Sequence, residues 1–293
     1  GAALSSAADP LAADLFFVVP SAEHTERVVS LLIQRGLKGF FHKRVTTLSR
    51  LANDLFRITD VPVVSSLTRT MIIRDLIREN AWDYFSEVFD QPGFLGLMTQ
   101  CVTELKESCI PPEIFRERMN ALKGFEPAYG AKYEALAGFY EQYEARLKAR
   151  GLRDGQDALR IYRERQKKTK VPVKRFRSVW IDGFFDFSNL QIEYLRELSG
   201  ITEDVTITLT MEEEREGVFE AVNRTRQDLE KLGFRVHMMK TRSYRTENPD
   251  LLFLQRNIFS QKITGEVPPG RDIALLDAIG TEGEIEMIAR QIH

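Results

Sequence analysis

One stretch of the chain, residues 176–191, restricts the possible folds more than any other. Residues 179–181 form the short apolar run that is typical of a central strand in a parallel sheet. Ser188 or Asn189 can cap a helix that begins directly afterwards. Asp182 is therefore expected at the carboxyl end of a buried strand, and in open α/β folds ligands bind at that edge of the sheet.

Two similar units precede this stretch. The unbroken apolar run at residues 15–19 predicts a buried strand, Ser21 can cap the helix after it, and Gly36 can close that helix. A shorter unit follows, in which residues 44–47 are extended and Thr47 can cap the next helix. Strand and helix alternate here, which predicts an α/β fold with a parallel sheet.

Residues 65–170 have a different character, because only helical patterns occur there. Ser66 begins one helix, whose apolar face we expect to contain Leu67, Met71, Leu76 and Ile77. The clearest helix covers residues 131–150, with an apolar face formed by Tyr133, Leu136, Tyr140, Tyr143 and Leu147. No strand candidate interrupts the segment, so we expect an all-helical insertion into the α/β domain.

Strands and helices are both predicted again after residue 176. We expect a half-buried strand at residues 204–211, helices at 217–232 and 248–259, a strand at 273–278, and a helix opened by the capping-box pattern of residues 281–284. The predicted organisation is a tail at 1–14, a sheet domain at 15–65 and 176–260, a helical insertion at 66–175, a linker at 261–272, and the beginning of a further domain at 273–293.

The composition excludes several classes of protein. A net charge of −2 predicts no general affinity for nucleic acid or membranes, so any basic surface must be local. No apolar run approaches the roughly 20 residues of a membrane span, and we expect a cytoplasmic protein. Cys101 and Cys109 are too few for a zinc or iron–sulfur site without other ligands, and the four histidines are scattered. We expect reduced, structural thiols.

Asp182 raises the question of nucleotide hydrolysis. A strand-tip aspartate holds Mg²⁺ in nucleotide-hydrolysing enzymes, usually beside a glutamate that orients water and together with a glycine-rich phosphate loop. Gly183 follows Asp182 here, and no G-x-x-x-x-G-K-[ST] occurs in the 293 residues. Asp182 and Gly183 can equally form a simple turn, and Asp186 can cap or position the next helix. The sequence argues against a self-contained hydrolase.

A basic stretch is the second candidate site. Residues 141–175 contain twelve Lys and Arg against five Asp and Glu, a difference of +7. Arg163, Arg165, Lys167 and Lys168 are the candidates for contact with phosphates there. A solvated helix face followed by a charged loop would produce the same pattern.

Hydroxyl groups at helix starts form the third candidate. Ser21 and Thr46-Thr47 follow predicted strands, where side-chain hydroxyls and free backbone amides suit phosphate contacts. Ordinary helix capping also accounts for residues of this kind.

The order of these motifs resembles that of a known family. A strand ending in Val18-Val-Pro-Ser21, then Val45-Thr-Thr-Leu-Ser-Arg-Leu51, then Gly151-Leu-Arg-Asp154 and Asp157-Ala-Leu159, then Trp180-Ile-Asp-Gly-Phe184, resembles the first helicase-like half of AddB. AddB proteins are components of bacterial ATP-dependent helicase–nucleases, and they are related to superfamily 1 helicases such as UvrD. The resemblance covers roughly residues 15–293.

The resemblance implies a RecA-like parallel sheet of the P-loop NTPase and helicase type, with the helical insertion as subdomain 1B. Asp182 falls on the first aspartate of the D-E-x-Q-D motif, Gly183 on its glutamate, Phe185 on its glutamine and Asp186 on its second aspartate. Pro20, Ser21, Thr46 and Thr47 fall at strand ends that meet single-stranded DNA in UvrD-like helicases. The catalytic glutamate is therefore replaced.

Three functions stay open at this point. The resemblance favours a non-catalytic module that binds single-stranded DNA and works with an AddA-like subunit, whereas the nuclease and iron–sulfur cluster of such proteins lie far downstream. An active helicase fragment is the second possibility, in which ATP and Mg²⁺ bind only if a P-loop lies upstream of Gly1. A protein–protein interaction module without DNA binding is the third.

Overall fold

We analysed a computed structural model of the chain. It describes residues 15–36, 44–56, 58, 60–80, 83–91, 93–168, 176–212, 215, 217–239, 246–260, 262–266, 270 and 273–292. The predicted tail at residues 1–14 and the last part of the basic stretch, residues 169–175, lie outside the described residues.

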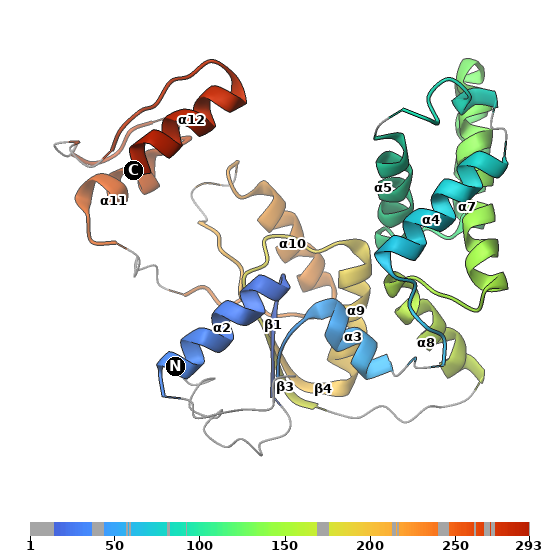
Figure 1. Cartoon of the computed structure of the whole chain (residues 1–293). Coiled ribbons are helices and arrows are strands. Elements are labelled where there is room, and N and C mark those ends of the chain that lie inside the picture. The colour runs from blue at the N-terminus through green and yellow to red at the C-terminus, as the bar shows by residue number, and fades with distance from the viewer. Residues whose placement is uncertain are drawn as a thin grey trace. The chain divides into compact units, whose positions relative to one another are not determined.

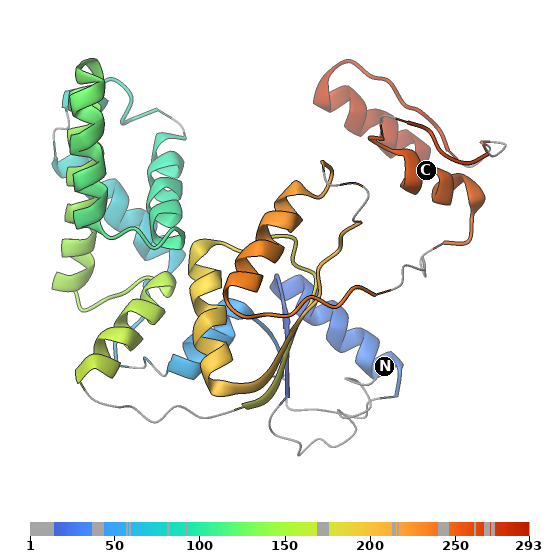
Figure 2. The ribbon, with the colours of Figure 1, turned by 180° about the vertical axis from the view of Figure 1, so that it is seen from behind.

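A four-stranded, entirely parallel sheet is the centre of the α/β part. Its strands are β1 (Leu15–Val19), β2 (Val45–Thr47), β3 (Phe176–Ile181) and β4 (Thr202–Ile207), in the order β2-β1-β3-β4. Helices α2 (Ala22–Gln34) and α9 (Asn189–Ile201) lie on opposite sides of the sheet, and α3 (Leu48–Phe56) lies on the side of α9 (Figures 1 and 2). The RecA-like α/β class that the sequence predicted is confirmed.

The predicted local signals determine where these elements begin and end. β1 and β3 have the predicted bounds, because each is a short apolar run whose residues Val18, Val179 and Ile181 are buried. Ser21 caps α2 by accepting a hydrogen bond from the backbone N–H of His24, at 3.3 Å. Gly36, with φ of +93°, follows the end of α2 as expected.

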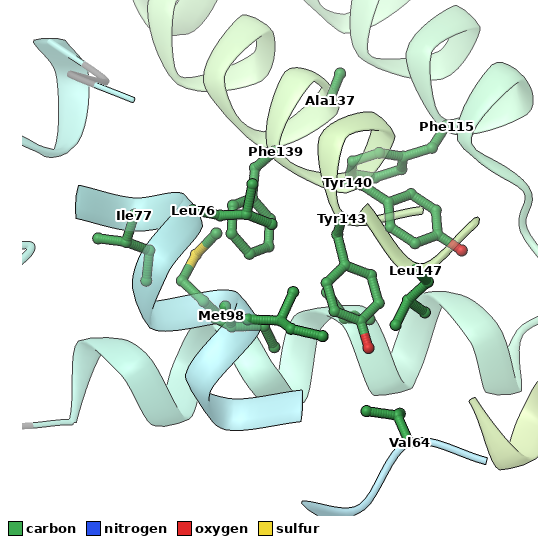
Figure 3. Close-up of a cluster of buried hydrophobic side chains, with 13 residues drawn as sticks. Val64, Leu76, Ile77, Met98, Phe115, Ala137, Phe139, Tyr140, Tyr143 and Leu147 are labelled. Carbon is green, nitrogen blue, oxygen red and sulfur yellow. The ribbon is translucent and has the colours of Figure 1, made fainter. Parts of the chain in front are cut away.

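The helical block, residues 64–149, has its own core. It consists of α4 (Ser66–Glu79), η3 (Asp83–Phe85), α5 (Phe94–Glu107), α6 (Pro112–Phe125), η4 (Pro127–Tyr129) and α7 (Gly130–Ala149). Figure 3 shows buried side chains of α4, α5 and α7 meeting in this core. The core cluster is formed by Val64, Ile72, Ile73, Leu76, Ile77, Met98, Val102, Phe115, Ala137, Phe139, Tyr140, Tyr143 and Leu147.

Two expectations for the helical block need correction. Ser65, and not Ser66, caps α4, and it accepts a hydrogen bond from the N–H of Thr68 at 3.1 Å. Leu67 and Met71 are 70% and 44% exposed, because α4 turns the side chains from Ile72 to Ile77 into the core instead. Tyr140, Tyr143 and Leu147 of α7 are buried as predicted.

The two cysteines lie where the sequence suggested. Cys101 is in α5 and Cys109 is in the turn after it, and neither forms a disulfide. Burial raises the pKa of both thiols, which disfavours the reactive thiolate.

Helix α8 (Ala158–Lys168) follows the turn η5 (Gly155–Asp157) and packs on helices of the sheet. The ring of Tyr162 stacks on Phe56 of α3 with 4.5 Å between centroids. The predicted insertion, residues 66–175, included α8. The domain boundaries stay a prediction, but these contacts join α8 to α3.

The contacts divide the chain into two compact units. The first contains residues 1–210 and 224–233, and the second contains residues 211–223 and 234–293. Helix α10 (Glu220–Lys231) begins three residues later than predicted, whereas α11 (Pro249–Asn257) has the predicted Asn248 cap and ends two residues before Phe259. Helix α12 (Gly280–Ile292) completes the second unit.

Three predictions for the second half were wrong. β4 covers Thr202–Ile207 and not residues 204–211, because Thr202 already pairs with Phe176 directly after α9. Residues 273–278 form no strand, since no described strand pairs with them. Thr281 lies inside α12 and not at its cap.

No helix in the described part of the chain combines the length and the apolar character that a membrane crossing requires.

Candidate functional site

The carboxyl edge of the sheet brings together residues that are far apart in the sequence. Since all four strands are parallel, their carboxyl ends share one edge. We call the residues at this edge the sheet-edge cluster: Pro20 and Ser21 after β1, Thr47 at the end of β2, Asp182 and Gly183 after β3, and Thr208 after β4.

Hydrogen bonds at the strand ends hold this arrangement. The N–H of Asp182 donates to the carbonyl of Val18 at 3.0 Å, and the N–H of Thr208 donates to the carbonyl of Ile181 at 2.9 Å. The hydroxyl of Thr208 donates to the Asp182 carboxylate. Asp182 is exposed, and its carboxylate therefore faces solvent at the edge while Thr208 orients it.

Gly183 has a backbone conformation that suits glycine. Its φ is +85°, and a Cβ atom added to it would lie 3.4 Å from Cδ of Pro20. A side chain at position 183 would therefore be strained and would also press on the loop after β1. The replacement of glutamate by glycine that the resemblance implied coincides with this left-handed backbone.

The predicted hydroxyl residues differ in their availability. Ser21 Oγ lies 2.8 Å from His24 Nδ1, and Thr47 Oγ1 accepts from the N–H of Arg50 at 3.4 Å, so both act as helix caps. Thr46 is only 7% exposed and does not present its hydroxyl to solvent. Pro20 is exposed.

Asp186 does not cap α9. Ser188 does so, in a capping box: Ser188 Oγ accepts from the N–H of Gln191 at 3.3 Å, and Gln191 Oε1 accepts from the N–H of Ser188 at 2.8 Å. Asp186 is exposed on the loop between β3 and α9.

Three residues near the edge were not identified from the sequence as candidates. Phe185 is 66% exposed directly after Gly183, whereas Phe184 is buried and stacks on Phe187 at 4.9 Å. Arg50 is exposed in the first turn of α3, and Thr208 orients Asp182. Thr208 could have been found from the alternation of threonines in β4, but the exposure of Phe185 has no sequence signal, since Phe184 beside it is buried.

Much of the basic stretch is neutralised within the protein. Arg163 forms ion pairs of 2.7 Å with Glu193 and Glu197 of α9, and Arg165 forms one of 2.7 Å with Asp60. Lys167 and Lys168 are exposed at the end of α8, and neither forms an ion pair with the residues that the structure describes. The phosphate-contact role of all four residues stays a prediction, and the ion pairs of the two arginines weaken it.

A groove of about 1160 Å³ lies between α7 and α8. Lys148, Arg160 and Lys167 line it together with Glu113, Glu141 and Glu164. Cations and carboxylates are mixed along its walls, so the groove does not have the uniform positive charge of a path for a phosphate backbone.

Glu144, Asp154 and Asp157 bring three carboxylates close enough to hold a metal ion. The ammonium of Lys106 occupies the place between them, at 2.5 Å from Glu144, 2.7 Å from Asp154 and 2.9 Å from Asp157. Lys106, Glu144, Asp154 and Asp157, which we call the buried ion cluster, therefore already contain their cation.

The buried ion cluster predicts a loss of stability at alkaline pH. Burial opposes the charged form of Lys106, but Asp157, Asp154 and Glu144 outweigh this effect and raise its pKa. Burial, followed by the charge of Asp154, raises the pKa of Tyr143. Both groups keep their protons to a higher pH in the folded protein. Their stabilisation is thus complete below the unfolded pKa values of about 10 and is lost as the pH rises through the folded values.

We expect the urea midpoint to fall above about pH 10. Urea unfolding followed by circular dichroism from pH 7 to pH 11 would check this, with Tyr143→Phe as the comparison, because that variant removes one of the two groups. A midpoint that stays constant or rises above about pH 10 would contradict the prediction.

Comparison with known proteins gives one family. Residues 4–256 match the family described as "ADDB, N-terminal". The chain is 25% identical over 299 residues to the second subunit of the ATP-dependent helicase/deoxyribonuclease of Desulforudis audaxviator, covering 95% of this chain and 25% of that protein. It is 23% identical over 310 residues to the protein of the same name in Bacillus subtilis, covering 97% of this chain and 26% of that protein. The chain thus spans about a quarter of the length of these relatives.

Proposed function

Because the chain belongs to the AddB N-terminal family, we propose that it is the helicase-like, non-catalytic DNA-binding and scaffolding region of an ATP-dependent helicase–nuclease. Such a protein would take part in the repair and recombination of broken DNA together with an AddA-like subunit. The observation that carries the proposal is the sheet-edge cluster, in which a strand-tip aspartate is retained beside a glycine.

The residues at the edge do not fit ATP hydrolysis. Asp182 could supply one oxygen ligand to Mg²⁺, but Gly183 offers no carboxylate to orient water, and the 293 residues contain no phosphate loop. Positioned water and a phosphate cradle account for most of the rate of such enzymes. The cluster therefore supports binding rather than phosphoryl transfer.

The edge offers suitable groups for single-stranded DNA. Exposed Phe185 can stack on a base, because every base has an aromatic face, and the guanidinium of Arg50 can pair with a phosphate. The basic stretch is the weaker candidate surface, since Arg163 and Arg165 already pair with acidic side chains.

Fluorescence anisotropy with a labelled single-stranded oligonucleotide, repeated over a salt series, tests the proposal. We expect binding that weakens as salt increases, because phosphate contacts release counterions. Absent or salt-independent binding by the intact protein would sink it. Charge reversal at Lys167 and Lys168 provides a further arm: unchanged affinity would locate the contact away from the end of α8, whereas a large loss would make the basic stretch the main contact.

The second candidate function is that of an active helicase fragment, favoured only by the exposed carboxylate of Asp182 at its strand tip. ATP hydrolysis by the intact protein that is lost in Asp182→Asn would support this function over the first. In that case the ATP-binding residues would have to come from outside these 293 residues.

Gly183→Glu restores the glutamate of the helicase motif, and we expect it to fail in a specific way. A glutamate at a φ of +85° costs about 1 to 3 kcal/mol of stability, and no ATP hydrolysis should appear. Chemical unfolding and a phosphate-release assay would check both. Gly124→Glu is the matched control, because Gly124 lies in α6 without a left-handed φ and with open space around its added Cβ. A Gly183→Glu protein as stable as this control would contradict the strain.

A further inference from the structure

Two segments connect the helical block to the sheet, and they pair with each other. The outgoing segment contains Pro62 and Val64, and the returning segment contains Arg153. The N–H of Val64 donates to the carbonyl of Arg153 at 2.8 Å, and the N–H of Arg153 donates to the carbonyl of Pro62 at 3.1 Å. The chain thus leaves and re-enters the sheet domain at one hydrogen-bonded position.

The side chain of Arg153 reaches into the sheet domain. Arg153 is 4% exposed, and its Nε donates to the carbonyl of Val61 at 3.0 Å. Its Nη2 donates to the carbonyl of Ile58 and to Oδ1 of Asn53 in α3, both at 3.2 Å. No carboxylate is among these partners. The guanidinium is held by a fork of neutral oxygens, whose positions only a planar group with several donors can match.

The next side chain, Asp154, points in the other direction. It is 1% exposed and accepts from the hydroxyl of Tyr143 in α7 at 2.9 Å. Its carboxylate also pairs with Lys106 of α5 at 2.7 Å and with Arg69 of α4 at 3.4 Å. One residue of the pair therefore contacts α3 of the sheet domain, and the other contacts three helices of the block.

The cores of the two parts are separate. All members of the core cluster of the block lie between Val64 and Leu147, and none comes from α3, α8 or α9. Helices α5 and α9 also contact each other. Apolar packing is tolerant of small shifts, whereas a buried polar network is satisfied in one geometry only. Buried charges are a weak source of stability but can specify one arrangement.

We propose that Arg153 and Asp154 form a joint that fixes the angle of the helical block on the sheet domain. Without it the two parts would stay folded around their own cores and would rock about the paired segments. This inference does not depend on DNA binding, so it can fail while the proposed function holds.

Distance measurements between spin labels test the joint. Labels are placed at the exposed residues Ser30 of α2 and Ala121 of α6, as Ser30→Cys and Ala121→Cys, in a protein that carries Cys101→Ala and Cys109→Ser. We expect one narrow distance distribution in the parent. In Arg153→Met it should become roughly twofold wider, because a hinge then opens, while circular dichroism still shows folded helices.

Two further variants complete the test. Arg153→Lys keeps the charge but cannot match the fork of carbonyls, so it should also widen the distribution. Arg150→Met replaces an exposed arginine three residues earlier and should leave it narrow. A folded Arg153→Met or Arg153→Lys protein with the parent's distribution would overturn the proposal.

A measurement without variants at Arg153 guards against variants that fail to fold. Hydrogen exchange of the N–H groups of Val64 and Arg153 should be as slow as that of the core of α7, because the joint opens only with the whole molecule. Fast exchange at these two amides beside a protected α7 would also overturn the proposal.

Discussion

Replacing Lys106 by methionine is expected to lower the free energy of unfolding by about 3 to 5 kcal/mol at neutral pH. The ammonium lies within 2.9 Å of carboxylate oxygens of Glu144, Asp154 and Asp157. Methionine has a similar length but no charge, so three carboxylates would remain together with far less compensation. Urea unfolding followed by circular dichroism measures the loss.

Two comparisons make this result specific. Lys123→Met is the matched control, since the Lys123 side chain is 54% exposed and its nearest carboxylate, Glu134, is 3.9 Å away; we expect a change within about 0.5 kcal/mol. The loss in Lys106→Met should also shrink near pH 5, because burial already raises the pKa of Glu144 and that carboxyl can then take up a proton. A loss equal to that of the control would show that the cluster contributes no stability.

Phe185→Ala is expected to weaken binding of single-stranded DNA by about tenfold or more, because stacking of a base on an aromatic ring contributes about 1 to 3 kcal/mol. Phe185 is 66% exposed beside Gly183 at the carboxyl edge of the sheet. Arg50→Ala should instead reduce the slope of log affinity against log salt by about one, since one phosphate contact is lost. Anisotropy titrations at several salt concentrations separate the two effects.

Phe125→Ala provides the control for the stacking prediction. Phe125 is 85% exposed at the end of α6, far in the sequence from the sheet edge, and its loss should leave the affinity unchanged. Equal losses for Phe125→Ala and Phe185→Ala would indicate a non-specific effect of removing an exposed ring. An unchanged affinity for Phe185→Ala alone would remove stacking from the proposed interface.

The sequence predicted best those elements whose signal is local. β1 and β3 are apolar runs of five and six residues with polar ends, and their bounds were correct. The caps at Ser21, Ser188 and Asn248 depend on one side chain and a nearby N–H, so they were also predictable.

Elements whose state depends on distant partners were predicted poorly. Residues 273–278 have the composition of a strand, but a strand needs a neighbour to receive its hydrogen bonds. Arg163 and Arg165 belonged to a run of uncompensated charge in the sequence, and their acidic partners Glu193, Glu197 and Asp60 are 30 to 105 residues away. Charge balance at a surface is a property of the fold and cannot be counted along a window of sequence.

The candidate site shows both situations. Asp182 and Gly183 could be identified as the degenerate helicase motif from their position after a strand. The contact between Gly183 and Pro20 depends on the pairing of β1 with β3 across the inserted block, and the sequence offers no signal for it.

The pairing of Val63 with Arg153 has a consequence for the history of the protein. The ends of an inserted segment that lie side by side can be bridged by a short turn, so the segment can be gained, lost or exchanged without disturbing the host. About ninety residues separate the two positions, yet at the level of the gene they behave as a single splice point. A chimera in which the helical block is replaced by a short glycine-containing turn between Pro62 and Asp154 would keep the order of the parallel strands. The block is in this sense a module, and relatives can vary its size and surface independently of the sheet.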